Sequence, residues 1–123
     1  MGAALGVAAL LSGCAGAQAD DVSDVAAAFE DPAGDPGERC ALLVPATVAA
    51  LESEESAPCA DVISELPLEG GAVESVEVWG GDAQVRLSGD TLFLAETPAG
   101  WRVVAAACEP RAGAPYDCEV EGP

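Results

Sequence analysis

The stretch that decides the fold is residues 73–97, VESVEVWGGDAQVRLSGDTLFLAET. Polar and apolar side chains alternate along residues 76–79 and 83–88, as they do in strands with one buried face. Gly80-Gly81 between these runs is typical of a tight hairpin, and Gly89-Asp90 marks the next turn. Thr91 to Thr97 then forms a strand. The stretch therefore predicts an antiparallel meander.

The chain after this stretch extends the meander. Pro98-Ala99-Gly100 predicts another turn, and residues 101–108 are too apolar to leave one face of a strand open to water. Residues 116–121 alternate again, with their acids pointing outward. We therefore expect about five antiparallel strands.

The chain before residue 73 is expected to be helical. Asp20 or Asp21 can cap a helix that ends before the turn-rich residues 31–37. Its apolar side chains follow the spacing of one helix face: Val22, Val25, Ala26 and Phe29. Shorter helices are predicted over residues 38–43, from Pro45 through Leu51, and from Pro58-Cys59 onward, with Leu43, Val48 and Leu51 facing the core. Helices followed by strands define an α+β domain.

The N-terminal residues resemble a bacterial lipoprotein leader. Residues 3–11 are apolar and too few to span a bilayer. Leu11-Ser12-Gly13-Cys14 resembles a lipobox, which implies lipidation of Cys14 and cleavage before it. We expect a signal peptide over 1–13, a lipidated tether over 14–19 and one domain over 20–123, held on the outer face of the cytoplasmic membrane. Met1-Gly2 lacks the usual positive charge, which leaves the translation start open.

Four cysteines remain once Cys14 is assigned to lipid, and four cysteines permit three pairings. We favour Cys40–Cys59 and Cys108–Cys118, because each pair lies within one local unit. Zinc sites and thiol oxidoreductases favour Cys-x-x-Cys pairs, which the sequence lacks, and it has no histidine. Structural disulfides are therefore expected, with neither metal nor cofactor.

The charge balance excludes some partners. The 123 residues include 22 acids and four Lys or Arg residues, for a net charge of −18. Such a chain repels nucleic acid and anionic lipid headgroups. No histidine or lysine is present to activate a serine, and neither a Gly-x-Ser-x-Gly elbow nor a glycine-rich phosphate loop occurs.

Four residues are candidates for a pocket: Trp79, Asp90, Phe93 and Trp101. The rings of Trp79 and Trp101 could line it, although such rings more often belong to a core. Asp90 could act as a general base if it faced a cavity. The competing and favoured interpretation is a turn residue that bonds its own backbone.

Several strings resemble a group of small, uncharacterised actinobacterial lipoproteins. They are residues 40–47 (CALLVPAT), Leu51, Pro58-Cys59, residues 89–94 (GDTLFL), 100–103 (GWRV) and 115–118 (PYDC). The resemblance covers nearly all of residues 20–121. Residues 100–103, with the strand before them, also look like the sheet of nuclear-transport-factor-two-like (SnoaL-like) domains. That resemblance implies helices packed into a curved, cone-like sheet.

The expected function is that of a non-catalytic, membrane-tethered binding or interaction module. The open end of a cone could hold a small apolar ligand or a segment of an envelope protein. One alternative is an extracytoplasmic enzyme that uses Asp or Glu in the cone. The other is a structural envelope protein that acts through its acidic surface.

Overall fold

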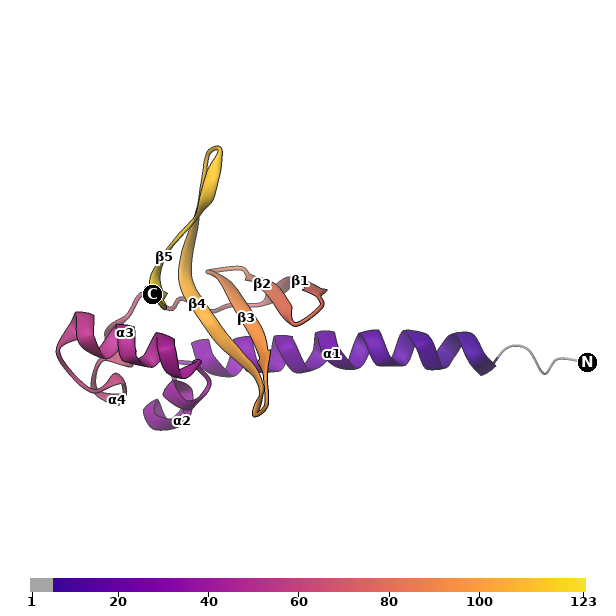
Figure 1. Cartoon of the computed structure of the whole chain (residues 1–123), viewed down its shortest axis with the longest axis horizontal. Coiled ribbons are helices and arrows are strands. Elements are labelled where there is room, and N and C mark those ends of the chain that lie inside the picture. The colour runs from indigo at the N-terminus through magenta and orange to yellow at the C-terminus, as the bar shows by residue number, and fades with distance from the viewer. Residues whose placement is uncertain (1–5) are drawn as a thin grey trace, which may run out of the picture.

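The computed structural model of the chain describes the backbone of residues 6–123 and the side chains of residues 16–123 except Ala114. It has the predicted α+β arrangement, with helices in the first half and a five-stranded antiparallel sheet in the second (Figure 1). The helices are α1 (Gly6–Glu30), α2 (Pro36–Ala41), α3 (Pro45–Glu55), α4 (Cys59–Val62) and the 3-10 helix η1 (Ile63–Glu65).

The sheet is a meander, as predicted. Its strands are β1 (Val73–Trp79), β2 (Asp82–Leu87), β3 (Thr91–Thr97), β4 (Gly100–Arg111) and β5 (Ala114–Glu121). Each strand pairs with the next in the chain, so β1 and β5 are the edges of the described sheet. Trp79 pairs with Asp82 across a two-residue turn, in which Gly80 has a φ of 63° that glycine adopts without steric cost. The sheet is open, and its cone-like curvature stays a prediction.

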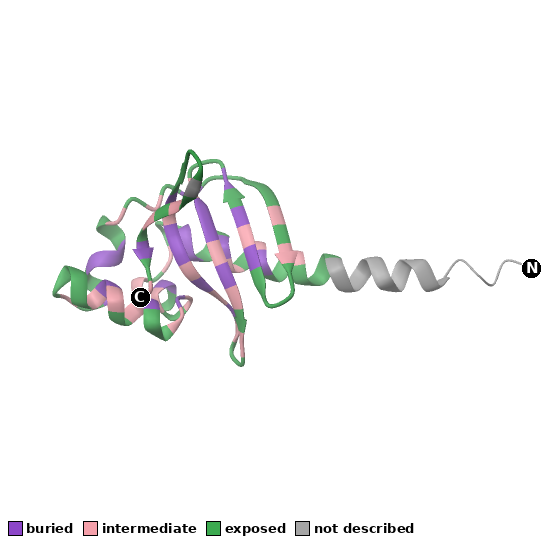
Figure 2. Ribbon diagram, turned by 45° about the horizontal axis from the view of Figure 1, so that its top comes forward, coloured by how far each residue is buried: buried purple, intermediate pink, exposed green. Residues whose placement is uncertain are grey.

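The core lies between α1 and one face of the sheet. Val22, Ala26 and Phe29 of α1 are fully buried, which confirms most of the predicted apolar stripe. They face a sheet whose buried residues include Leu92 and Leu94, alternate residues of β3. Figure 2 shows this alternation as bands of buried and partly exposed residues along the strands. The opposite face of the sheet is therefore free for other contacts.

The short helices gather near the end of α1 and carry the first disulfide (Figure 1). The helix α2 begins two residues earlier than predicted, because Pro36 occupies its first turn and Asp35 caps it. The Glu38 N–H donates to Asp35 Oδ2 at 3.0 Å. A disulfide joins Cys40 to Cys59, which confirms the predicted pairing and fixes α2 to α4.

The helical end attaches to the sheet along β4. The Val44 N–H donates to the Val103 carbonyl at 2.9 Å, and the Val103 N–H donates to the Leu42 carbonyl at 2.7 Å. Thr47, which is fully buried, donates its hydroxyl to the Val104 carbonyl at 2.8 Å. The bonds at Val103 therefore satisfy backbone groups of β4 before its pairing with β5 begins at Ala105.

The predicted leader is only partly described. The predicted signal peptide, residues 1–13, and the predicted lipidation site, Cys14, lie outside the residues whose side chains are described. The backbone of residues 14–19 belongs to α1, which begins at Gly6, so the prediction that Asp20 or Asp21 caps this helix is wrong: both lie inside it. Across the described chain, every helix is too short or too polar to cross a membrane. The two disulfides are typical of proteins in oxidising, extracytoplasmic compartments.

Candidate functional site

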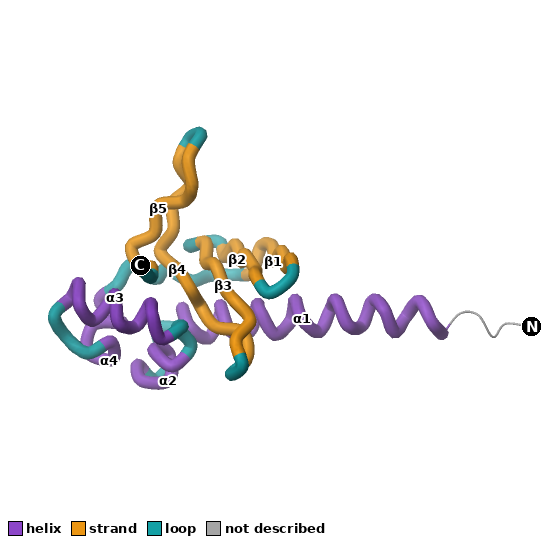
Figure 3. Tube along the Cα trace, in the orientation of Figure 1, coloured by secondary structure: helices purple, strands orange, loops and turns teal. Residues whose placement is uncertain are grey.

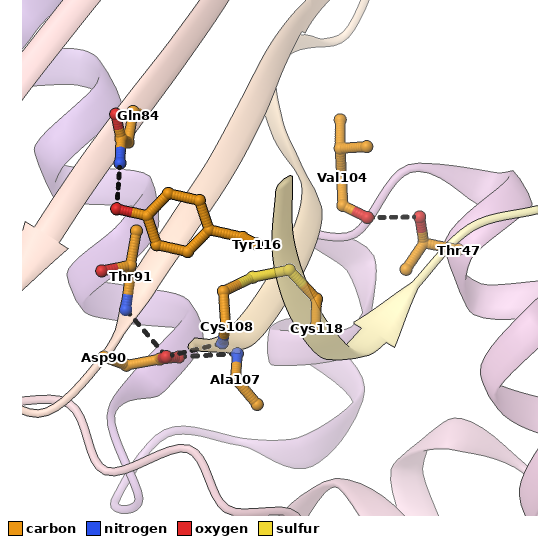
Figure 4. The surroundings of a disulfide bond; sticks show 9 residues. All are labelled: Thr47, Gln84, Asp90, Thr91, Val104, Ala107, Cys108, Tyr116 and Cys118. Atoms are coloured by element: carbon orange, nitrogen blue, oxygen red, sulfur yellow. Dashed lines mark hydrogen bonds between the residues drawn. A yellow bond between two sulfur atoms is a disulfide. The ribbon is translucent and has the colours of Figure 1, made fainter. Parts of the chain in front are cut away.

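The turn between β2 and β3 holds a carboxylate that binds a distant strand. Asp90 accepts hydrogen bonds from three backbone N–H groups: Thr91 at 2.8 Å, Ala107 at 2.8 Å and Cys108 at 3.0 Å (Figure 4). Ala107 has a φ of 55°, a left-handed conformation that costs an alanine about 1–2 kcal/mol. We call Asp90 and its three N–H donors the Asp90 clamp. The clamp stabilises this strained residue of β4.

A second carboxyl group is buried close to the clamp, to which Gly70 links it through the N–H of Gly89. Glu30, the last residue of α1, is only 1% exposed. Its Oε1 accepts the Gly70 N–H at 2.9 Å, whereas its Oε2 accepts no hydrogen bond from any described residue. An unpartnered buried carboxylate oxygen is costly unless the group takes up a proton.

The pKa of Glu30 reflects this environment. The pKa is raised from 4.5 to about 9, chiefly by burial and further by Asp90, through a hydrogen bond to the protonated form and through its negative charge. The Gly70 N–H and the Arg39 charge oppose the rise without reversing it. Glu30 is therefore protonated at pH 7. Arg39, itself buried, donates its Nε–H to the Phe29 carbonyl at 2.7 Å.

The third feature is an apolar cleft beside the β4–β5 hairpin. These two strands leave the body of the sheet together (Figure 3). A disulfide joins Cys108 to Cys118, as predicted. The cleft has a volume of about 460 Å³. We call it the hairpin cleft, and its walls include Phe93, Val104, Ala105, Pro115, Tyr116 and Glu121.

Two aromatic rings from different strands meet at this cleft. Phe93 of β3 and Tyr116 of β5 pack edge to face, with ring centroids 5.2 Å apart and an interplanar angle of 69°. The Gln84 Nε2 of β2 donates to the Tyr116 hydroxyl oxygen at 3.2 Å (Figure 4). Phe93 alternates with the buried Leu92 and Leu94, so the cleft lies on the sheet face opposite α1.

The structure separates the four predicted pocket residues. Phe93 alone lines the hairpin cleft. Trp101 is 5% exposed and belongs to the core, whereas Trp79 is 53% exposed at the β1–β2 turn. Asp90 lines a polar cleft of about 210 Å³ together with Glu69, Glu109, Asp117 and Glu119. Among the described residues, no group of three or more acids or cysteines is placed to hold a metal ion.

Two residues of interest were not predicted. Tyr116 was assigned to a strand but not to a site, because its partner Phe93 is 23 positions away in the sequence. Glu30 lies four residues after Ala26 and so falls on the apolar stripe of α1. An acid on that stripe is a signal that the sequence does contain.

Comparison with protein-family models, with curated proteins and with solved structures finds no match for this chain. The resemblance to small actinobacterial lipoproteins and to SnoaL-like domains therefore stays a prediction. The described residues form an α+β domain with two disulfides, a buried glutamic acid and an apolar cleft on the sheet face opposite α1.

Proposed function

We propose that the protein is a lipoprotein, tethered through Cys14 to the outer face of the cytoplasmic membrane, which binds a small apolar ligand in the hairpin cleft. The disulfides support an extracytoplasmic location, and the lipobox-like residues 11–14 support the anchor. In this proposal the domain is a non-catalytic binding module.

The observation that carries this proposal is the aromatic wall of the cleft. A volume of about 460 Å³ falls within the range of small-molecule sites. Phe93 and Tyr116 present ring surface to it, and Glu121 is the one charged residue found in its lining. A ligand of modest size with an aromatic or aliphatic body fits such a surface best.

The acid chemistry of the alternative enzyme is less well supported. A general base needs a free lone pair that reaches the substrate. The oxygens of Asp90 already accept three backbone N–H groups, which holds the carboxylate in a structural role. This arrangement favours a binding module over catalysis by Asp90.

The test is titration with a neutral fluorescent probe, N-phenylnaphthylamine, because the net charge of −18 would repel anionic dyes. We expect binding to the domain, and we expect Phe93→Ala to weaken it about tenfold through lost ring contact. Trp79→Ala is the matched control, because it removes an exposed aromatic ring away from the cleft. Equal losses in both variants, or no binding to the parent, would contradict the proposal.

The anchor is tested separately by the intact mass of the protein extracted from its native membrane. We expect a diacylglyceryl group on Cys14 and four thiols that appear only after reduction. An unmodified residue 14 in the mature chain would contradict the proposed lipid anchor. It would not bear on the proposed ligand binding in the hairpin cleft.

A further inference from the structure

Glu30 and Asp90 come from distant parts of the chain and are brought close together by Gly70. The Gly70 N–H donates to Glu30 Oε1 at 2.9 Å, and the Gly70 carbonyl accepts the N–H of Gly89, the neighbour of Asp90, at 2.8 Å. Glu30 ends α1, and Asp90 lies in the β2–β3 turn. Glu30 is 1% exposed, and its Oε2 accepts no hydrogen bond from any described residue. Asp90 is the acceptor for the Ala107 and Cys108 N–H groups of β4 (Figure 4). The proposed binding function uses neither carboxyl group.

We propose that Glu30 and Asp90 share one proton, and that this proton is a pH-sensitive latch that holds the β4–β5 hairpin in place. The proton sits on Glu30 Oε2 and is donated to Asp90. The Asp90 oxygens already accept three N–H groups, whereas Glu30 Oε2 accepts none, so the proton is assigned to Glu30. An ionised Glu30 would be destabilised both by its burial and by the negative charge of Asp90.

The other charged groups around Glu30 are consistent with one shared proton. Arg39 of α2 is the cation whose charge acts on Glu30, and its Nε–H is already bonded to the Phe29 carbonyl. Asp31 and Glu69 line the same small cleft as Glu30 and add negative charge. Further acids line the cleft around Asp90 and act in the same direction: Glu109, Asp117 and Glu119. The raised pKa of Glu30, about 9, agrees with this balance.

The latch reaches the hairpin through Ala107. When the shared proton is lost, two negative charges face each other and Asp90 is displaced from its N–H donors. The left-handed Ala107 then loses the bonds that stabilise it, and β4 can relax at that residue. Because Tyr116 reaches Phe93 from this hairpin, the hairpin cleft opens with it. This last consequence rests on the proposed binding function.

The sign of the pH effect follows from the pKa values of Glu30. Between pH 4.5 and about 9 the folded chain keeps the proton that the unfolded chain has lost. Unfolding therefore releases one proton, and raising the pH favours unfolding. The stabilisation is complete below pH 4.5 and is lost progressively as the pH rises to about 9.

The experiment compares denaturant unfolding of the parent and of Glu30→Gln between pH 5 and pH 8. Glutamine keeps the shape, accepts the Gly70 N–H and donates permanently to Asp90. The unfolding equilibrium constant of the parent, divided by that of the variant, is expected to rise about tenfold per pH unit. The control is Glu54→Gln, the same change at an exposed position of α3, which should run parallel to the parent. Parallel profiles for the parent and Glu30→Gln would overturn the proposal.

Two further readouts separate the latch from the cleft. The carbon-13 shifts of Ala107 report its backbone conformation, and we expect them to move toward strand values in the parent above pH 9 but not in Glu30→Gln. Shifts that stay constant through the titration of Glu30 would overturn the latch. Probe affinity should fall over the same pH range in the parent only. If the probe binds at no pH while Ala107 still responds, the binding function fails and the latch stands.

Discussion

The two faces of the sheet carry different parts of this molecule. On the inner face, Leu92 and Leu94 belong to the same core as Phe29 of α1, and all three side chains are buried. The outer face presents Phe93, which is partly exposed and contacts Tyr116. Because side chains alternate along a strand, Leu92 and Leu94 contribute to stability while their neighbour Phe93 is available to a ligand. In a small domain this division matters, because residues of the core cannot also be offered to a ligand.

The largest expected effect comes from deleting a ring on the inner face. Phe29→Ala should lower the free energy of unfolding by about 4 kcal/mol, because it leaves a cavity between α1 and the sheet. Phe93→Ala removes the same atoms on the outer face and should cost about 1 kcal/mol. Denaturant unfolding of both variants measures the difference. Similar losses would mean that the outer face is packed as tightly as the core.

The two disulfides also differ in whether they are expected to affect stability alone or ligand binding as well. Replacing Cys40 and Cys59 by serine should cost about 3 kcal/mol of stability and leave probe binding unchanged, because this disulfide closes the helical end. Replacing Cys108 and Cys118 should cost slightly less, since that loop is shorter, but should also weaken probe binding. Unfolding curves and probe titrations of the two double variants check this. Unchanged probe binding in the Cys108 and Cys118 double variant would show that the cleft does not depend on this disulfide.

Most of the fold could be predicted because its signals are local. The alternation on either side of Gly80-Gly81 defines β1 and β2, and the turn residues fix the meander. Proline marks the start of α3, as predicted. The start of α2 was missed by two residues because Pro36 and the Asp35 cap lie inside what reads as a turn-rich linker. A helix end that depends on a capping residue is hard to locate when the surrounding residues are typical of loops.

The candidate site was less predictable because its contacts are not local. Asp90 does bond the N–H of its neighbour, as a turn residue should, but its other two donors lie 17 and 18 residues away. The link between Glu30 and Asp90 spans α1 and the sheet, and nothing in either segment alone reveals it. Trp79 and Trp101 have the same side chain, yet one is exposed and one buried, which depends on tertiary packing.

The smallest expected effect comes from removing a hydroxyl group from the outer face of the sheet. A buried hydroxyl group provides the comparison. Tyr116→Phe removes the acceptor for Gln84 on the outer face, where water can replace it, and should cost less than about 0.5 kcal/mol. Thr47→Val removes a fully buried hydroxyl and leaves the Val104 carbonyl without that donor, so about 1–2 kcal/mol is expected. The free energies of unfolding of the parent and the two variants, measured under the same conditions, give the two losses to be compared. Equal costs would show that the outer face excludes water as the interior does, and that the hairpin cleft is closed before any ligand arrives.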